Sequence, residues 1–259
     1  MGFSDGDFLL IEYTVRVKET GTIIDTTSEE LAKKENIYES GRVYGPILVV
    51  LGKGWINSVV EEALKDMDIG SEKEVEVPPE KAFGRRDPSK VKVFSIREFR
   101  RRNIDVKVGD VIEVGGARGI VKSISGGRVV VDFNHPLADK TLVFKVKVVD
   151  KLEKLEDKVR ALAVRHLQVP GDEITIEYQP DEKKLVIALP SKYVAKKDIQ
   201  YAKISLAADI YSFFKDMIKK LEFHEVFEFE KPKETEKPEE TEEQPVVKSE
   251  AGGEEQGGE

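Results

Sequence analysis

The stretch Thr141-Leu142-Val143-Phe144-Lys145-Val146-Lys147-Val148-Val149 alternates apolar and charged residues over much of its length, which is typical of a strand with one buried face. An earlier strand-rich segment stops at Glu80-Lys81-Ala82-Phe83-Gly84 without its last strand. Residues 85–138 lie between the two stretches and have a periodicity of their own. We therefore predict that the late strand completes the early sheet and that one domain is inserted into a loop of another.

The segments on either side of the insertion predict an α+β domain. Alternation and turn residues favour strands at 8–18, 23–27, 47–51 and 72–77, and a short capped helix at 28–35. Residues 56–67 have helical spacing, with one apolar face formed by Ile56, Val59, Val60, Ala63, Leu64 and Met67. These elements predict a sheet packed on one main helix.

The inserted stretch predicts a small β-rich unit with one helix. Three short strands are expected at 108–114, 118–123 and 128–133, and the pairs Gly115-Gly116 and Gly126-Gly127 are typical of hairpin turns. A short helix is expected at 95–103.

The last part of the chain predicts a third, α/β unit. Residues 153–158 are charged and are interpreted as a connector. A hairpin is expected from 173–178 and 184–189, a long amphipathic helix from about 196 to 221, and a last strand at 225–229. The apolar stripe of that helix fits either a private core or a subunit interface, and we expect self-association through residues 156–230. Residues 231–259 have almost no apolar side chains and are expected to be disordered.

The composition excludes several kinds of site. The chain has no cysteine, so disulfides, cysteine zinc sites and thiol nucleophiles are excluded. The three histidines are far apart, and no phosphate-binding loop or nucleophile elbow occurs. We therefore expect no cofactor and no metal.

The sequence also favours a cytoplasmic location and a thermophilic source. No apolar run approaches the roughly 18 residues that span a bilayer, and the first residues lack a signal pattern, so no membrane partner is expected. The charged fraction of 36% with three methionines is typical of thermophile proteins.

Charge is distributed unevenly along the chain. The net charge is −8, and residues 231–259 contain ten Glu and four Lys. Residues 84–138 contain twelve Lys or Arg and six Asp or Glu, so the insert is basic within an acidic protein.

Asp25 is the carboxylate that stands out, because it follows Ile23-Ile24 on an apolar strand. Judged alone, it fits a strand-end aspartate that caps a turn. Judged alone in the same way, Tyr13, Phe83 and Phe144 fit aromatic residues of a hydrophobic core.

Taken together, several segments resemble the FKBP-type peptidyl-prolyl cis-trans isomerases, in the order of that family. They cover residues 5–84 and 139–152 and are Tyr13-Thr14-Val15, Ile24-Asp25-Thr26-Thr27, Val50-Leu51-Gly52-Lys53-Gly54, Glu61-Glu62-Ala63-Leu64, Pro78-Pro79-Glu80-Lys81-Ala82-Phe83-Gly84 and Thr141-Leu142-Val143-Phe144. The insertion after Phe83-Gly84, with return through Asn134-His135-Pro136-Leu137-Ala138, is similar to SlyD-type and long archaeal members.

The resemblance implies an antiparallel half-barrel on one helix, with an apolar groove that catalyses X-Pro isomerisation. It implies catalytic roles for Tyr13, Asp25 and Phe83, and substrate binding by Ile47, Val49, Ile56, Val60 and Phe144. It also implies the following parts: an isomerase domain at 1–84 and 139–155, an insert-in-flap chaperone domain at 85–138, and a C-terminal domain at 156–230 before the acidic tail. The expected partners are unfolded or partly folded proteins with X-Pro bonds.

Two departures from the family pattern bear on the site. Val60 stands where many members have tryptophan, and Phe83 replaces the commoner tyrosine. These departures bear on the binding of the family's macrolide inhibitors more than on isomerase strength. One alternative function is a client-holding chaperone with a weak or inactive groove. Another is nucleic-acid binding by a basic insert through Arg97, Arg100, Arg101, Arg102, Arg118 and Arg128, which the scarcity of aromatic residues there disfavours.

Overall fold

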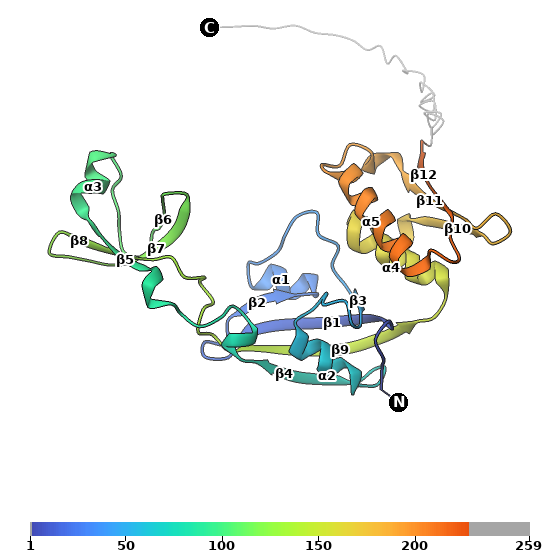
Figure 1. The fold of residues 1–259 in the computed structure, drawn as a ribbon, viewed down its shortest axis with the longest axis horizontal. Coiled ribbons are helices and arrows are strands. Elements are labelled where there is room, and N and C mark those ends of the chain that lie inside the picture. The colour runs from blue at the N-terminus through green and yellow to red at the C-terminus, as the bar shows by residue number, and fades with distance from the viewer. Residues whose placement is uncertain (1, 228–259) are drawn as a thin grey trace, which may run out of the picture. The chain divides into compact units, whose positions relative to one another are not determined.

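A five-stranded antiparallel sheet organises the first part of the molecule (Figure 1). The computed structural model describes residues 2–227. Strands β1 (Phe8–Val17), β2 (Ile23–Thr26), β4 (Glu72–Val77) and β9 (Leu142–Leu152) lie in the order β2-β1-β9-β4, and β3 (Ile47–Val50) pairs with β1. The α+β prediction is confirmed. The late strand, β9, lies in the middle of the sheet between β1 and β4.

One face of this sheet carries the core that supports the candidate site. On β9 the alternation places Val146 and Val148 inward and leaves Lys145 and Lys147 exposed. Helix α2 (Ser58–Lys65) lies across that face, with Val60 and Leu64 fully buried (Figure 1). The helix is shorter than predicted, because the Asn57 side chain accepts the N–H of Val59 and caps it. Ile56 therefore precedes the helix. A second short helix, α1 (Glu29–Lys34), begins after the Ser28 cap.

The inserted segment forms a separate four-stranded sheet. Its strands β5 (Val91–Ser95), β6 (Val111–Val114), β7 (Ala117–Ser125) and β8 (Arg128–Asp132) lie in the order β5-β8-β7-β6. Helix α3 (Ile96–Arg101) begins with a capping box from Ser95 and Glu98. A small core is formed by Phe99, Val106, Val121, Val129 and Val131. Both predicted glycine turns are present, and all four glycines have positive φ, from 54° to 79°, which other residues adopt at a cost. Strand β5 was not predicted.

The last segment differs most from the prediction. Residues 153–158, interpreted as a connector, enter helix α4 (Leu155–Leu167), which buries Val159, Leu162, Ala163 and Leu167. Helix α5 (Ile199–Phe214) ends before residue 221, because the N–H groups of Lys219 and Lys220 bond to the Lys183 carbonyl and start strand β12 (Lys220–Val226). β12 runs parallel to β11 (Lys184–Pro190), which pairs with β10 (Thr175–Gln179). The strand expected at 225–229 thus begins earlier, and residues from 228 on, with the predicted disordered tail, lie outside the described residues.

The core of this last segment includes side chains from the outer face of the first sheet. Phe8, Leu48, Val50 and Leu152 belong to the same buried cluster as Leu162, Leu206 and Ile210. Phe8 also stacks on Phe214, with ring centroids 5.9 Å apart. The five-stranded sheet therefore has an apolar core on each face.

Four short 3-10 helices complete the described elements: Pro79–Lys81, Pro88–Lys90, Gly171–Glu173 and Ser191–Tyr193. Within residues 2–227, none of the helices has the length and apolar character that crossing a membrane requires.

Candidate functional site

Six of the eight predicted site residues lie in one apolar cluster between the sheet and α2. Val49 and Val60 are fully buried there, and Tyr13, Ile47, Ile56 and Phe144 are half-buried at its edge. The rings of Tyr13 and Phe144, from neighbouring strands, have centroids 6.4 Å apart. Side chains from β1, β3, β9, α2 and the loop before it therefore meet where the predicted groove was expected.

A polar network borders this cluster. The Tyr13 hydroxyl donates to Asp25 Oδ2 at 2.5 Å, and Arg42 Nη1 donates to Asp25 Oδ1 at 2.8 Å. Arg42 Nη2 also lies 3.4 Å from the Tyr13 hydroxyl. Asp25 Oδ1 also accepts the N–H of the next residue, Thr26, at 2.8 Å within strand β2. Asp25 therefore accepts hydrogen bonds from Tyr13, Arg42 and the Thr26 backbone and lies at the centre of this network.

Electrostatics keep the Tyr13 hydroxyl protonated. Burial raises the pKa of Tyr13 well above its ordinary value, and the hydrogen bond and negative charge of Asp25 raise it further. Tyr13 is therefore a hydrogen-bond donor over the whole physiological pH range.

Arg42 was missed in the sequence. It lies in the loop between α1 and β3, 17 residues after Asp25, and its charge resembles that of many surface residues of this chain. Only the folding of that loop over β2 brings its guanidinium to the carboxylate. A single sequence carries no signal for such a contact.

Phe83 is placed apart from the other predicted residues. Its side chain is 44% exposed and is not among those that pack in the cluster. Its ring stacks on His135, with centroids 4.1 Å apart and planes within 3° of parallel. Phe83 therefore contacts the segment that leaves the insert, and its catalytic role stays a prediction.

The two ends of the insert are joined at its base. The N–H of Asp139 donates to the Gly84 carbonyl at 3.0 Å. Asp132 is buried; its Oδ1 accepts two bonds from Asn134, and its Oδ2 pairs with Arg86 at 2.6 Å. Burial favours the neutral acid, but the Asn134 hydrogen bonds and the Arg86 charge outweigh it and lower the pKa of Asp132.

This base predicts a pH-dependent effect of Asp132→Asn. At pH 7 the variant should lose about 1–3 kcal/mol of local unfolding free energy, because buried partners are left unpaired. A carboxyl group whose pKa is lowered in the folded state stabilises the fold at pH values above its ordinary pKa, roughly 4. This stabilisation is lost as the pH falls through the folded-state pKa. The difference between wild type and variant should therefore shrink below about pH 4. Hydrogen exchange of the β8 amides measures it, with the exposed Asp105→Asn as control. A pH-independent difference would contradict the assignment.

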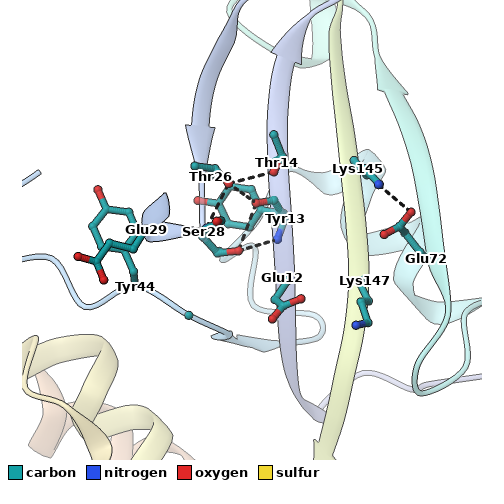
Figure 2. A pocket seen from close by; sticks show the side chains of 12 residues that line it. Glu12, Tyr13, Thr14, Thr26, Ser28, Glu29, Tyr44, Glu72, Lys145 and Lys147 are labelled. Carbon is teal, nitrogen blue, oxygen red and sulfur yellow. Dashed lines mark hydrogen bonds and ion pairs between the residues drawn. The ribbon is translucent and has the colours of Figure 1, made fainter. Parts of the chain in front are cut away.

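A polar pocket on the other face of the sheet is not the candidate site (Figure 2). It has a volume of about 530 Å³ and shares only Tyr13 with the predicted residues. Its Thr14 and Thr26 hydroxyls bond to each other at 2.9 Å, and Lys145 pairs with Glu72 at 3.0 Å, as Figure 2 shows. Four of its polar side chains are thus engaged with one another. No group of three or more His, Asp or Glu within residues 2–227 is placed to hold a metal ion.

Two stretches of the chain match known family models. Residues 92–137 match a family model described as "FKBP26, IF domain", and residues 155–228 match one described as "FKBP26_C-terminal". A short-type peptidyl-prolyl cis-trans isomerase of Methanocaldococcus jannaschii is 36% identical over 145 residues, covering 56% of this chain and 91% of the relative.

Two bacterial proteins are also similar. The FKBP-type isomerase SlyD of Treponema pallidum is 33% identical over 159 residues, 60% of this chain and 81% of the relative. The FKBP-type 16 kDa isomerase of Escherichia coli is 31% identical over 118 residues, 43% of this chain and 78% of the relative. The chain belongs to the FKBP-type peptidyl-prolyl cis-trans isomerase family.

Proposed function

We propose that this protein isomerises X-Pro bonds at the apolar cluster of Tyr13, Ile56 and Phe144, and that its insert holds the unfolded client. The observation that carries the first part is the half-buried apolar cluster with the Tyr13–Asp25–Arg42 network at its border. X-Pro bonds exchange over tens to hundreds of seconds without catalysis, so a catalyst matters to folding.

The chemistry needs no nucleophile and no base. Resonance gives the peptide bond its barrier of about 18–20 kcal/mol and makes the planar amide more polar than the twisted one. Apolar surroundings remove water from the amide and penalise the planar ground state. The Ile56 N–H, by its place in the family pattern, would hold the carbonyl that precedes proline. Lowering the barrier by about 5 kcal/mol gives a rate gain of a few thousandfold.

The polar network would act on the same carbonyl. The Tyr13 hydroxyl donates its one proton to Asp25, so a substrate carbonyl would have to compete with Asp25 for it, and Arg42 also donates to the hydroxyl and helps to hold it in place. Phe83 would pack near the proline once a substrate is bound.

The insert offers a surface for clients. Val93, Val108 and Val111 are 59%, 62% and 68% exposed, and all lie on this small unit. Exposed apolar groups of this kind bind unfolded chains and would raise their concentration near the site. The six arginines of the nucleic-acid alternative are also exposed. Steep loss of affinity with salt would favour nucleic acid, and weak salt dependence favours unfolded protein.

The proposal is tested by proline-limited refolding of a client with catalytic amounts of this protein. Rate enhancement with turnover supports the enzyme. Binding that slows refolding in proportion to the amount added, without turnover, would leave the client-holding alternative.

The apolar stripe of α5 lies in the core of its own segment, with Leu206 and Ile210 buried, so self-association through residues 156–230 is proposed on the exposed face of this helix instead. Tyr201, Ile204 and Tyr211 lie on one face of α5 and are 73%, 66% and 70% exposed. We expect a dimer by light scattering for the full chain, and a monomer for Tyr201→Glu with Tyr211→Glu. The matched double variant Val93→Glu with Val111→Glu on the insert should stay dimeric. A monomeric wild type would rule out this interface.

A further inference from the structure

Helix α4 contacts the loop that carries Ile56. Trp55, directly before Ile56, lies under the guanidinium of Arg165, whose Cζ is 4.2 Å from the ring centroid. The rings of Trp55 and Phe213 of α5 also pack edge to face, with centroids 6.0 Å apart. Lys53 of the same loop places its Nζ 5.1 Å from the Phe213 ring. The loop before α2 is thus held by two helices of the C-terminal segment.

The same helix also contacts the loop that carries Arg42. The N–H of Val43 donates to Gln168 Oε1 at 3.0 Å. The other side of that amide is fixed as well, since Gln168 Nε2 donates to the Arg165 carbonyl at 2.9 Å. Gln168 ends α4 with φ +52°, a conformation uncommon for residues other than glycine. This unusual helix end aims a side-chain carbonyl at the neighbour of Arg42.

We infer that Arg165 and Gln168 of α4 are positioning residues for the isomerase site, each fixing one of its two loops. Arg165 fixes the position of Trp55. Because the Cα atoms of Trp55 and Ile56 are only about 3.8 Å apart along the chain, it also fixes the position of the Ile56 N–H. Gln168 sets Val43 and hence the guanidinium that binds Asp25. This inference rests on the proposed function and gives the C-terminal segment a part in catalysis.

The size of the effect follows from geometry. A misplacement of about 1 Å in a catalytic group can reduce the rate by on the order of a hundredfold. A variant that removes the contacts of one loop leaves the other loop in place, so each variant is expected to lose only part of the catalytic rate. Arg165→Gln and Gln168→Ala should each lower kcat/KM for a short X-Pro peptide by about fivefold to tenfold, mainly through kcat.

Conservative variants separate positioning from general damage. Arg165→Lys keeps a cation over the indole and should recover at least half of the lost kcat/KM. Gln168→Glu keeps the acceptor for Val43 and should recover activity relative to Gln168→Ala. Lys215→Gln, an exposed cation at the end of α5, is the matched control and should equal wild type.

Trp55 is the single tryptophan of the sequence, so its fluorescence reports on the loop directly. Arg165→Gln should shift the emission of the folded protein to the red, and Gln168→Ala should shift it less. The inference is overturned if Arg165→Gln moves the emission while kcat/KM stays at the wild-type value, or if the lysine variant is no better than glutamine. A wild type without any isomerase activity would instead remove the proposed function and this inference with it.

Discussion

Replacing Asp25 with alanine should lower kcat/KM for a short X-Pro peptide by about thirtyfold. The carboxylate accepts hydrogen bonds from the Tyr13 hydroxyl and from Arg42, and its loss leaves the half-buried guanidinium without its partner. A hydrogen bond to a charged group contributes roughly 2 kcal/mol, and about 1.4 kcal/mol corresponds to a tenfold change in rate. The Tyr13 hydroxyl would also lose the acceptor that fixes its position.

The measurement is a protease-free isomerisation assay on a peptide, together with a thermal melt to show that the variant is folded. Tyr13→Phe should lose less than Asp25→Ala, because it removes the hydroxyl but leaves the Asp25–Arg42 pair. Glu30→Ala on the exposed side of α1 is the control and should equal wild type. If Asp25→Ala together with Phe83→Ala keeps the full rate, the site lies elsewhere.

Removing residues 85–138 and joining Gly84 to Asp139 through a short glycine linker should reduce catalysed refolding of a protein by on the order of a hundredfold. The deletion removes the surface that is proposed to raise the local concentration of client, and linked two-site binding can gain that much. The two ends already meet at 3.0 Å through the Asp139 N–H and the Gly84 carbonyl, so a short linker suffices. The rate on a short peptide should stay within about threefold, because such a peptide has no second site to use.

The deletion also removes His135, on which Phe83 stacks. A triple variant, Val93→Ser with Val108→Ser and Val111→Ser, keeps that stack and removes only exposed apolar groups. It should repeat the refolding defect without changing the peptide rate. Full refolding activity in the triple variant would mean that clients do not bind through this surface.

The elements that could be predicted from the sequence are those formed by contacts between residues close together in the chain. Strand β9, α2 and the glycine turns of the insert were readable, because alternation, helical spacing and paired glycines are local signals. Helix α4 was missed because its buried residues, Val159, Leu162 and Leu167, are diluted by charges on its outer face. Likewise, β5 is an edge strand whose apolar side chains are half-buried or, at Val93, exposed, so its pattern is weak.

The site divides in the same way. Tyr13, Asp25 and Phe144 lie on strands, where register carries them to one face, and the family pattern named them. Arg42, His135 and Gln168 act from loop or helix ends, and their partners lie 17, 52 and 125 residues away in the chain. Such contacts depend on the final fold and leave no mark in local spacing.

The central place of β9 has a consequence for how the chain folds. Strands β1 and β4 both pair with β9, which is formed by residues 142–152. The five-stranded sheet can therefore form only after this late part of the sequence is available. Closing so long a loop has an entropic cost that grows with its length. An insert that folds first brings Gly84 and Asp139 together and shortens the loop to a few residues. A protein that is expected to accelerate proline-limited folding of other proteins would then depend on its own insert for rapid folding of its isomerase domain.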